Sequence, residues 1–257
     1  FRQTPAEILL SDGTYRTDFV YESYSISTGC VPMKALPSAY DNDNEAQTLS
    51  VCLRDQPSGL KLTLFYTVFS SVDVISRRVV LENEGNGSVS IRRLMSLQLD
   101  LENEGFSLVT FDGSWAKETH RHDRKLQYGQ FVNSSIVGTS SNRHNPGFLL
   151  YADEATEEHG HVYGFNLVYS GNHIGLVELS PNDLVRIQVG INPYCFDWQL
   201  RQGDSFETPE AVMTFSENGF DGMSAHFHDF VNRHIVRGNW KNQERPVLIN
   251  NWEACFF

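Results

Sequence analysis

Short segments in which apolar and polar residues alternate occupy most of the first 215 residues, and they restrict the fold more than any other feature. In residues 60–69, Leu64 and Tyr66 alternate with Thr63 and Phe65. A period of two is typical of a β-strand, and two rather apolar faces are expected when a strand lies between packed sheets. Further strands are predicted at residues 48–53, 74–82, 89–101, 106–111, 148–151, 162–169, 173–179, 184–190 and 211–215.

The composition agrees with a folded all-β domain. Of the 257 residues, 40% are hydrophobic and 12% are aromatic, which is enough for one large core or two smaller ones. The net charge of −12 argues against nucleic acid or an anionic membrane as a partner. No stretch approaches the roughly 20 apolar residues of a membrane span. We therefore expect a soluble protein that acts on a neutral ligand.

The sequence predicts two further local structures, a hairpin and a long loop. Residues 8–10 and 19–21 flank Asp12-Gly13, which predicts a β-hairpin with a tight turn. Between residues 116 and 145 the periodicity fades, which predicts a long loop of the kind that is usually functional.

One helix is predicted near the end of the chain. Between Gly222 and Val236, Met223, Phe227 and other apolar residues recur at helical spacing, and Gly238 is a suitable C-terminal stop. The sequence therefore predicts a run of antiparallel strands, then this helix.

A new structural unit is predicted after the helix. Residues 239–245 form a polar linker, and the apolar run 247–249 ends in Asn250-Asn251-Trp252-Glu253. This pattern is typical of a buried parallel strand with polar groups at its carboxyl end. In a β/α barrel, that end of each strand carries the catalytic and binding residues. We expect residues 1–238 to be a sandwich domain with a C-terminal helix, and residues 239–257 to be a linker and a first barrel strand.

The four cysteines do not form a motif. Cys30, Cys52, Cys195 and Cys255 are far apart and include no C-x-x-C pair, so we expect neither a zinc site nor a disulfide framework. Free thiols in a reducing compartment are the expectation, which favours a cytoplasmic location.

Several motifs compete for a chemical role. His120, His122 and Asp123 could be drawn as a metal site, but H-x-H on a strand is common on solvated surfaces, and we expect no metal. Residues 140–146 contain serines without the G-x-S-x-G turn of a nucleophile. In residues 190–198, the aromatic side chains are interpreted as packing. No pair of acidic residues is marked by a motif.

Trp115 is the most informative single residue, because it lies in a Gly-Ser loop at the end of a predicted strand. Its indole could cap the core, or it could offer a flat apolar face to a sugar ring while its N–H donates a hydrogen bond. The sequence leaves both interpretations open.

The order of several short motifs resembles one known family over essentially the whole chain. The motifs are Ser38-Ala39-Tyr40-Asp41, Leu64-Phe65-Tyr66-Thr67-Val68-Phe69, Gly113-Ser114-Trp115-Ala116-Lys117-Glu118, Val162-Tyr163-Gly164-Phe165-Asn166-Leu167-Val168-Tyr169-Ser170-Gly171-Asn172, Gly190-Ile191-Asn192-Pro193, Thr208-Pro209-Glu210-Ala211-Val212 and Arg245-Pro246-Val247-Leu248-Ile249-Asn250-Asn251-Trp252-Glu253-Ala254. Together they resemble the amino-terminal part of the glycoside hydrolase family 36 α-galactosidases.

The resemblance implies a large antiparallel β-supersandwich similar to the galactose mutarotase fold, followed by the first strand of a truncated (β/α)8 barrel. It implies hydrolysis, with retention, of terminal α-linked galactose in melibiose- and raffinose-type sugars, with no cofactor. It also implies a homotetramer. The family's two catalytic aspartates come from later barrel strands, so no catalytic residue is expected in this chain. The family's first roughly 80 residues would precede Phe1.

Two sugar-binding positions of the family match residues of this chain, namely Trp115 and Trp252. Two alternatives remain. One is a non-catalytic carbohydrate-binding or structural module. The other is a mutarotase-like epimerase, for which His144 and Glu210 would be the acid and the base.

Overall fold

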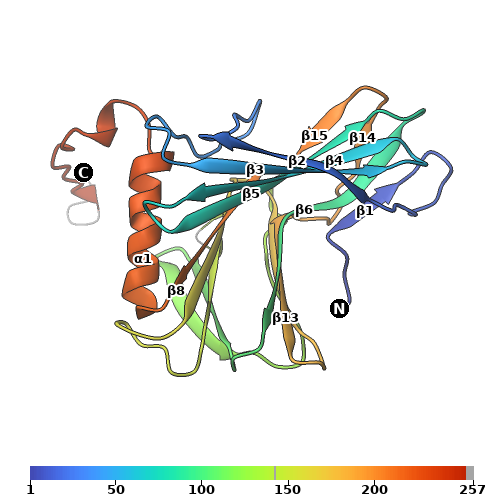
Figure 1. The fold of residues 1–257 in the computed structure, drawn as a ribbon. Helices are drawn as coiled ribbons and strands as arrows, with labels where there is room; N and C mark the ends of the chain where they lie inside the picture. Colours follow the sequence, from blue (N-terminus) through green and yellow to red (C-terminus); the bar gives the residue numbers. More distant parts are fainter. Residues whose placement is uncertain (142, 253–257) are drawn as a thin grey trace.

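The computed structural model describes residues 1–141 and 143–252. Two antiparallel sheets and one main helix make up this part of the chain (Figure 1). The all-β sandwich predicted from the alternating segments is confirmed. None of the helices among the described residues is long and apolar enough to cross a membrane.

The larger sheet has ten strands, and each pair of neighbours is antiparallel. In spatial order they are β2 (Val20–Thr28), β3 (Gln47–Asp55), β4 (Leu60–Phe69), β5 (Val74–Asn83), β16 (Glu210–Ser216), β11 (Val162–Val168), β10 (His144–Tyr151), β7 (Ser107–Ser114) and β8 (Lys117–Lys125), with β15 (Ser205–Glu207) also paired to β5.

The smaller sheet has five strands and covers part of the inner face of the larger one (Figure 1). Its order is β1 (Ala6–Leu9), β6 (Val89–Glu102), β13 (Leu184–Ile191) and β12 (His173–Leu179), and β14 (Trp198–Leu200) also pairs with β6. A further strand, β9 (Gly129–Ser134), lies beside β12, where the Ser135 N–H donates to the carbonyl of His173.

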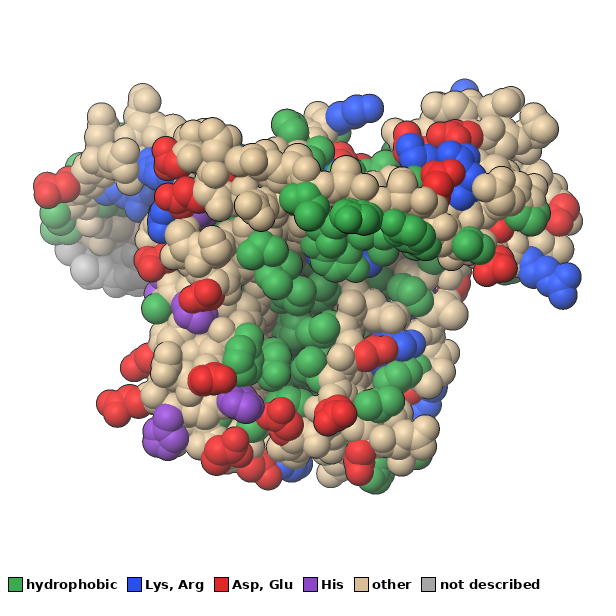
Figure 2. All heavy atoms as spheres, viewed as in Figure 1, with side chains coloured by type: hydrophobic (Ala, Val, Ile, Leu, Met, Phe, Trp, Pro, Cys, Tyr) green, Lys and Arg blue, Asp and Glu red, His purple; other side chains and the backbone are tan. Residues whose placement is uncertain are grey.

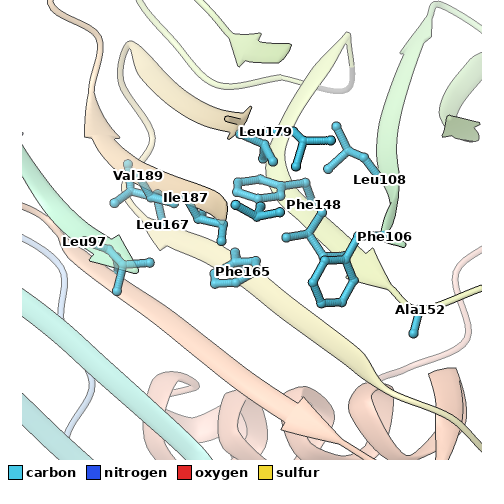
Figure 3. Packing of buried hydrophobic residues seen from close by; sticks show 14 residues of the cluster. Leu97, Phe106, Leu108, Phe148, Ala152, Phe165, Leu167, Leu179, Ile187 and Val189 are labelled. Carbon is cyan, nitrogen blue, oxygen red and sulfur yellow. The ribbon is translucent and has the colours of Figure 1, made fainter. Parts of the chain in front are cut away.

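The main core lies between the two sheets, where inward-facing residues from both meet (Figure 3). The rings of Phe148 and Phe165, from neighbouring strands, stack with their centroids 5.2 Å apart. Gly175 on β12 leaves space for Phe148, because a Cβ atom at this position would lie 2.6 Å from the Phe148 ring. The alternation noted in the sequence therefore reflects burial of every second side chain.

A single helix covers the outer face of the larger sheet (Figure 1). It consists of α1 (Gly219–Phe230) and a π-helical turn η1 (Val231–Ile235). A separate 3₁₀ turn η2 (Asn239–Lys241) follows Gly238. The apolar side of α1 packs at β11, where Gly164 lacks the Cβ that would collide with Phe227 and Met223. The helix predicted at 222–236 is confirmed and begins three residues earlier.

The predicted hairpin at residues 8–21 is wrong. The tight turn exists, with Gly13 at φ +83° and a hydrogen bond from its N–H to the carbonyl of Leu10. However, β1 pairs with β6 in the smaller sheet, whereas β2 pairs with β3 in the larger one. The turn therefore carries the chain from one sheet to the other, although Ile8 before it and Phe19 after it pack in the same core cluster.

The long loop predicted at residues 116–145 is also wrong, since β8, β9 and the start of β10 lie in it. All nine residues of β8 are exposed, because this strand is the outer edge of the larger sheet. With every residue exposed, the strand is composed of charged and polar residues and shows no alternation. Charge on an edge strand also disfavours pairing with other chains.

The strand predicted at residues 247–249 is not formed in the described residues. Residues 245–251 have no regular structure, and the side chain of Val247 is fully exposed. A parallel strand needs neighbours for its backbone hydrogen bonds and its apolar side chains. The described part of the chain supplies none at this point.

Candidate functional site

Trp115 occupies the tip of the hairpin between β7 and β8. Ser114 pairs with Lys117, which leaves Trp115 and Ala116 as a two-residue turn, with Ala116 at φ +57°. The N–H of Ala116 donates to Oε1 of Glu118 at 2.9 Å and fixes the turn. The Trp115 side chain is 91% exposed, so the interpretation that it caps the core is wrong.

The hairpin is anchored at its base to the helix. The guanidinium of Arg121 lies 4.4 Å from the centroid of the Phe220 ring. It also forms two hydrogen bonds with the carboxylate of Asp123, which hold the pKa of Asp123 below its usual value. The hairpin that presents Trp115 is thus restrained at β8 and α1.

Trp252 lies in the C-terminal tail, far along the chain from the hairpin. Its backbone N–H donates to Oδ1 of Asn250 at 3.0 Å, and its side chain is 56% exposed. The residues of the predicted barrel strand before it are also exposed. The two tryptophans are therefore presented by separate elements, and the part of the chain described does not show them forming one pocket.

An open groove of about 530 Å³ runs between α1 and the outer face of β7, β8 and β10. Its floor is aromatic and apolar, with Phe111 and Phe227, and its rim is polar, with Asn145, Asn166 and His228. Arg121 at this rim is neutralised by Asp123, so the groove suits a neutral polar partner better than an anion. Sequence reasoning missed it because its residues come from elements far apart in the chain.

The residues nominated for an epimerase do not face each other. Nδ1 of His144 lies 3.1 Å from Oδ1 of Asp112, on the neighbouring strand β7. Glu210 is buried and accepts a hydrogen bond from the N–H of Ala39 at 2.6 Å. Burial raises the pKa of Glu210, and each of the two residues is engaged with a different partner. The acid and base required by the epimerase hypothesis are therefore not brought together.

His173 is buried at the start of β12, and neither of its ring nitrogens has a hydrogen-bond partner among the described residues. Burial lowers the pKa of His173 to about 4, and the nearby His144 adds to the effect. The imidazole is neutral at pH 7 and is therefore unsuited to donate a proton there.

The histidines and the acid drawn above as a metal site point in different directions. His120 and His122 are paired with Asp112 and Thr110 across the β7–β8 ladder. Asp123, one residue further on, faces the other side of the strand and binds Arg121. Alternation along the strand therefore separates Asp123 from the two histidines.

The cysteines described by the structure are free thiols. Cys30 is partly buried, and desolvation raises its pKa to about 12. Cys52 donates to Oε2 of Glu22, and its pKa is also raised, first by burial. Thiols held in the protonated form are poor nucleophiles. Cys195 is exposed, and Cys255 lies outside the described residues.

The aromatic residues of segment 190–198 differ in their surroundings. Phe196 packs against a buried cluster that includes Leu81 and Leu200. The ring centroids of Trp198 and Phe206 lie 5.4 Å apart, in agreement with packing. Tyr194 is exposed. This segment adds no converging polar groups to the candidate site.

Comparison with known proteins gives a consistent match. Residues 1–201 match the glycosyl hydrolase family 36 N-terminal domain, and residues 205–257 match melibiase. Alpha-galactosidase 1 of Pediococcus pentosaceus is 39% identical over 255 residues, which cover 98% of this chain and 35% of that protein.

A solved structure, the GH36 alpha-galactosidase AgaA from Geobacillus stearothermophilus, superposes with a TM-score of 0.97 at 37% identity. The match covers 100% of this chain and 36% of that one. A variant of the same enzyme has been solved in complex with raffinose. The chain thus spans about 35% of the length of the relatives it matches.

Proposed function

The chain belongs to glycosyl hydrolase family 36, and we propose that it is the amino-terminal part of a retaining α-galactosidase. The enzyme would remove terminal α-linked galactose from oligosaccharides of the melibiose and raffinose type. The observation that carries this proposal is the match of the whole chain to relatives named α-galactosidases. The raffinose complex of one relative supports the substrate class.

Retention of configuration needs two carboxylic acids about 5–5.5 Å apart, one as nucleophile and one as acid and base. Many carboxylates of the described residues already form ion pairs, for example Asp100 with Arg186 and Glu45 with Arg233. We therefore assign the catalytic pair to the two thirds of the relatives' length that this chain does not match. On its own, the chain would be inactive.

The two tryptophans are assigned a role in sugar binding. An indole that is 91% exposed, as in Trp115, adds little to the stability of the fold, and its restrained hairpin can present it to a ligand. The face of an indole can stack on the apolar C–H side of galactose, while its N–H donates to a hydroxyl. Trp252 would line the same pocket from the end of the first barrel strand.

The proposed boundary between the two parts of the chain lies after the main helix. Residues 1–238 would be the sandwich domain with its helix, and residues 239–257 the linker and first strand of the catalytic barrel. The run 247–249 is apolar yet exposed, as expected of a strand whose neighbours belong to another part of the polypeptide. The match of residues 205–257 to melibiase includes this tail but begins before the helix, at residue 205.

The finer proposals concern assembly and location. We assign the complete enzyme to a cytoplasmic homotetramer that binds α-galactoside oligosaccharides. The free thiols of Cys30, Cys52 and Cys195 agree with a reducing compartment. An exposed tryptophan on a projecting hairpin agrees with contact to another subunit or domain.

The test is hydrolysis of p-nitrophenyl α-galactoside and of raffinose by the complete polypeptide and by residues 1–257 alone. The complete polypeptide should release galactose, initially as the α-anomer, and the shorter chain should release none. A complete polypeptide that binds raffinose without hydrolysing it would instead support the carbohydrate-binding module. Turnover by the shorter chain would contradict the placement of the catalytic pair.

A further inference from the structure

The segment between β2 and β3 is anchored on the outer face of the larger sheet, beside the C-terminal end of α1 (Figure 1). The N–H of Ala39, within this segment, donates to Oε2 of the buried Glu210 at 2.6 Å. Closer to β2, the carbonyl of Val31 accepts a hydrogen bond from Nη2 of Arg78 at 3.1 Å. Ala39 is itself buried, in a cluster that includes the end of the helix. The backbone of the next residue, Tyr40, is therefore held in place by the sheet.

Tyr40 caps the C-terminal end of the helix. A helix ends with carbonyl groups that have no donor within it. Here the last three carbonyls of η1 and that of Val236 each accept a hydrogen bond from outside the turn. The N–H of Tyr40 donates to the carbonyl of His234 at 2.9 Å, and its hydroxyl donates to that of Val236 at 2.8 Å. The other two carbonyls accept from Arg237 at 3.1 Å and from Lys241 at 3.0 Å.

The side chain of His234 binds the same tyrosine a second time. Its Nδ1 lies 2.9 Å from the carbonyl oxygen of Tyr40, and because a carbonyl can only accept, the imidazole donates. The ring of His234 is buried and packs on Phe69, with 4.6 Å between the ring centroids. The end of the helix therefore cannot shift along the sheet without breaking both bonds to the Tyr40 backbone.

Lys241 joins the start of the linker to the hydroxyl of Tyr40. Its ammonium donates to this hydroxyl as well as to the helix. The guanidinium of Arg237 and the ammonium of Lys241 lie 4.5 Å and 5.0 Å from the centroid of the Tyr40 ring, within the range of cation–π contacts. Figure 2 shows basic side chains at the upper left of this view, where Figure 1 places the end of α1. Cations at this end of a helix also interact favourably with its dipole.

We propose that Tyr40 is a positioning residue for sugar binding, because it fixes the point and the direction in which the chain leaves the sandwich toward Trp252. Residues 242–251 form neither helix nor strand, so the described part of this stretch is oriented at its start. Barrel neighbours would hold Trp252 within the barrel, whereas Tyr40 would set the barrel's first strand relative to the sandwich and to Trp115. This rests on the proposed function, in which both tryptophans line the galactose pocket.

The hydroxyl of Tyr40 can be removed with little other change. In Tyr40→Phe the backbone bonds to His234 and the aromatic ring remain, while the bonds to Val236 and Lys241 are lost. In Lys241→Met the same Tyr40–Lys241 bond is lost from the linker's side. Lys61→Met is the matched control, because it breaks an ion pair of 2.9 Å with Glu82 inside the larger sheet, away from the linker.

The test measures raffinose hydrolysis by these variants of the complete enzyme, at a temperature at which all of them are folded. Tyr40→Phe and Lys241→Met should each lower kcat/KM roughly tenfold, because a small displacement of a binding group is costly. The double variant should lose little more, since both changes break one contact. Lys61→Met should keep the wild-type kcat/KM. A wild-type value in Tyr40→Phe, or an equal loss in Lys61→Met, would overturn the proposal.

A double-mutant cycle with Trp115 separates positioning from stability. If Tyr40 acts by bringing the sugar and Trp115 together, Tyr40→Phe should have little effect on kcat/KM in an enzyme that already carries Trp115→Ala. If Tyr40 only stabilises the fold, the loss would be the same in both backgrounds. Such additivity would overturn the positioning role.

Hydrogen exchange gives a readout that does not depend on hydrolysis. In the linker region, the N–H groups of Val236 and Lys241 donate to the carbonyls of Val231 and Gly238. These amides should exchange faster in Tyr40→Phe than in wild type and in Lys61→Met, because the helix end and the linker are released. Faster exchange in a protein that hydrolyses no α-galactoside would overturn the proposed function and leave the placement of the linker by Tyr40 intact. Hydrolysis with unchanged exchange would overturn only the role of Tyr40.

Discussion

The guanidinium of Arg121 lies 4.4 Å from the centroid of the Phe220 ring, and this contact holds the outermost strand of the larger sheet against the first turn of α1. Within the larger sheet, β8 pairs with β7 alone. A strand paired on one side with all its residues exposed has few restraints. The Arg121–Phe220 contact is therefore important for the direction in which the hairpin presents Trp115.

Replacing Arg121 tests this restraint. The Arg121→Met variant keeps the apolar stem but loses the cation, and we expect it to lower the free energy of unfolding by about 0.5–1 kcal/mol. In the complete enzyme, KM for raffinose should rise because the hairpin is less well oriented. Arg121→Lys should recover part of both effects. A lower melting temperature with unchanged KM would show that the contact serves only stability.

Gly175 is expected to tolerate no side chain. A Cβ atom there would lie 2.6 Å from the Phe148 ring, so Gly175→Ala should lower the free energy of unfolding by about 1–3 kcal/mol through overpacking. The double variant Gly175→Ala with Phe148→Leu should be more stable than the sum of the two single losses predicts, because the smaller side chain makes space. Urea unfolding of the four proteins measures this coupling, and strict additivity would contradict the steric explanation.

The sequence predicts the central strands well because each buries alternate side chains against a partner layer. In β12, one such set contributes Val177 and Leu179 to the core. The errors arise where pairing is set by distant residues. Leu9 pairs with Ser90 and Val20 pairs with Arg54, so no local pattern could show that β1 and β2 belong to different sheets.

The candidate site shows a second reason why its structure could not be predicted fully from the sequence. The Gly-Ser-Trp motif indicates a turn, but only the pairing of Ser114 with Lys117 shows that Trp115 is at the tip, in water. The groove beside α1 could not be predicted, because it exists only once the helix packs across β10 and β11. A single strand such as 247–249 carries a recognisable pattern, yet it cannot form without its neighbours.

His173 should make stability depend on pH. Its pKa is about 4 in the folded protein and 6.5 in the reference state, so the unfolded chain binds more protons between these values. The contribution of the neutral His173 imidazole to stability is therefore fully present above pH 6.5 and is lost as the pH falls toward 4. Between pH 7.5 and pH 5 this group should lower the free energy of unfolding by about 2 kcal/mol. Urea unfolding of wild type and of His173→Gln at both pH values measures it, and an equal loss in the variant would contradict the assignment.

Trp252 is expected to act in binding once its strand has neighbours. In the complete enzyme, Trp252→Ala should lower kcat/KM for melibiose by roughly 10–1000-fold, because the sugar loses a stacking surface. Trp240→Ala, which removes another exposed tryptophan of the same tail, is the matched control and should have little effect. Equal effects of the two variants would indicate that the tail as a whole, and not the Trp252 indole, matters.

Replacing Trp115 distinguishes an effect on sugar binding from an effect on folding. Because its side chain is 91% exposed, Trp115→Ala should leave the melting temperature of residues 1–257 nearly unchanged. In the complete enzyme, the same change should lower kcat/KM for melibiose by roughly 10–1000-fold, or about 1.4–4 kcal/mol of transition-state stabilisation. Tyr194→Ala, at another exposed aromatic residue in a loop, is the control and should leave both quantities unchanged.

Trp115→Phe keeps a flat ring without the N–H and should recover part of the activity, since stacking on galactose needs only the aromatic face. If Trp115→Ala retained normal kcat/KM, the hairpin would have no part in sugar binding, and its exposed indole would have to be explained by contact between subunits.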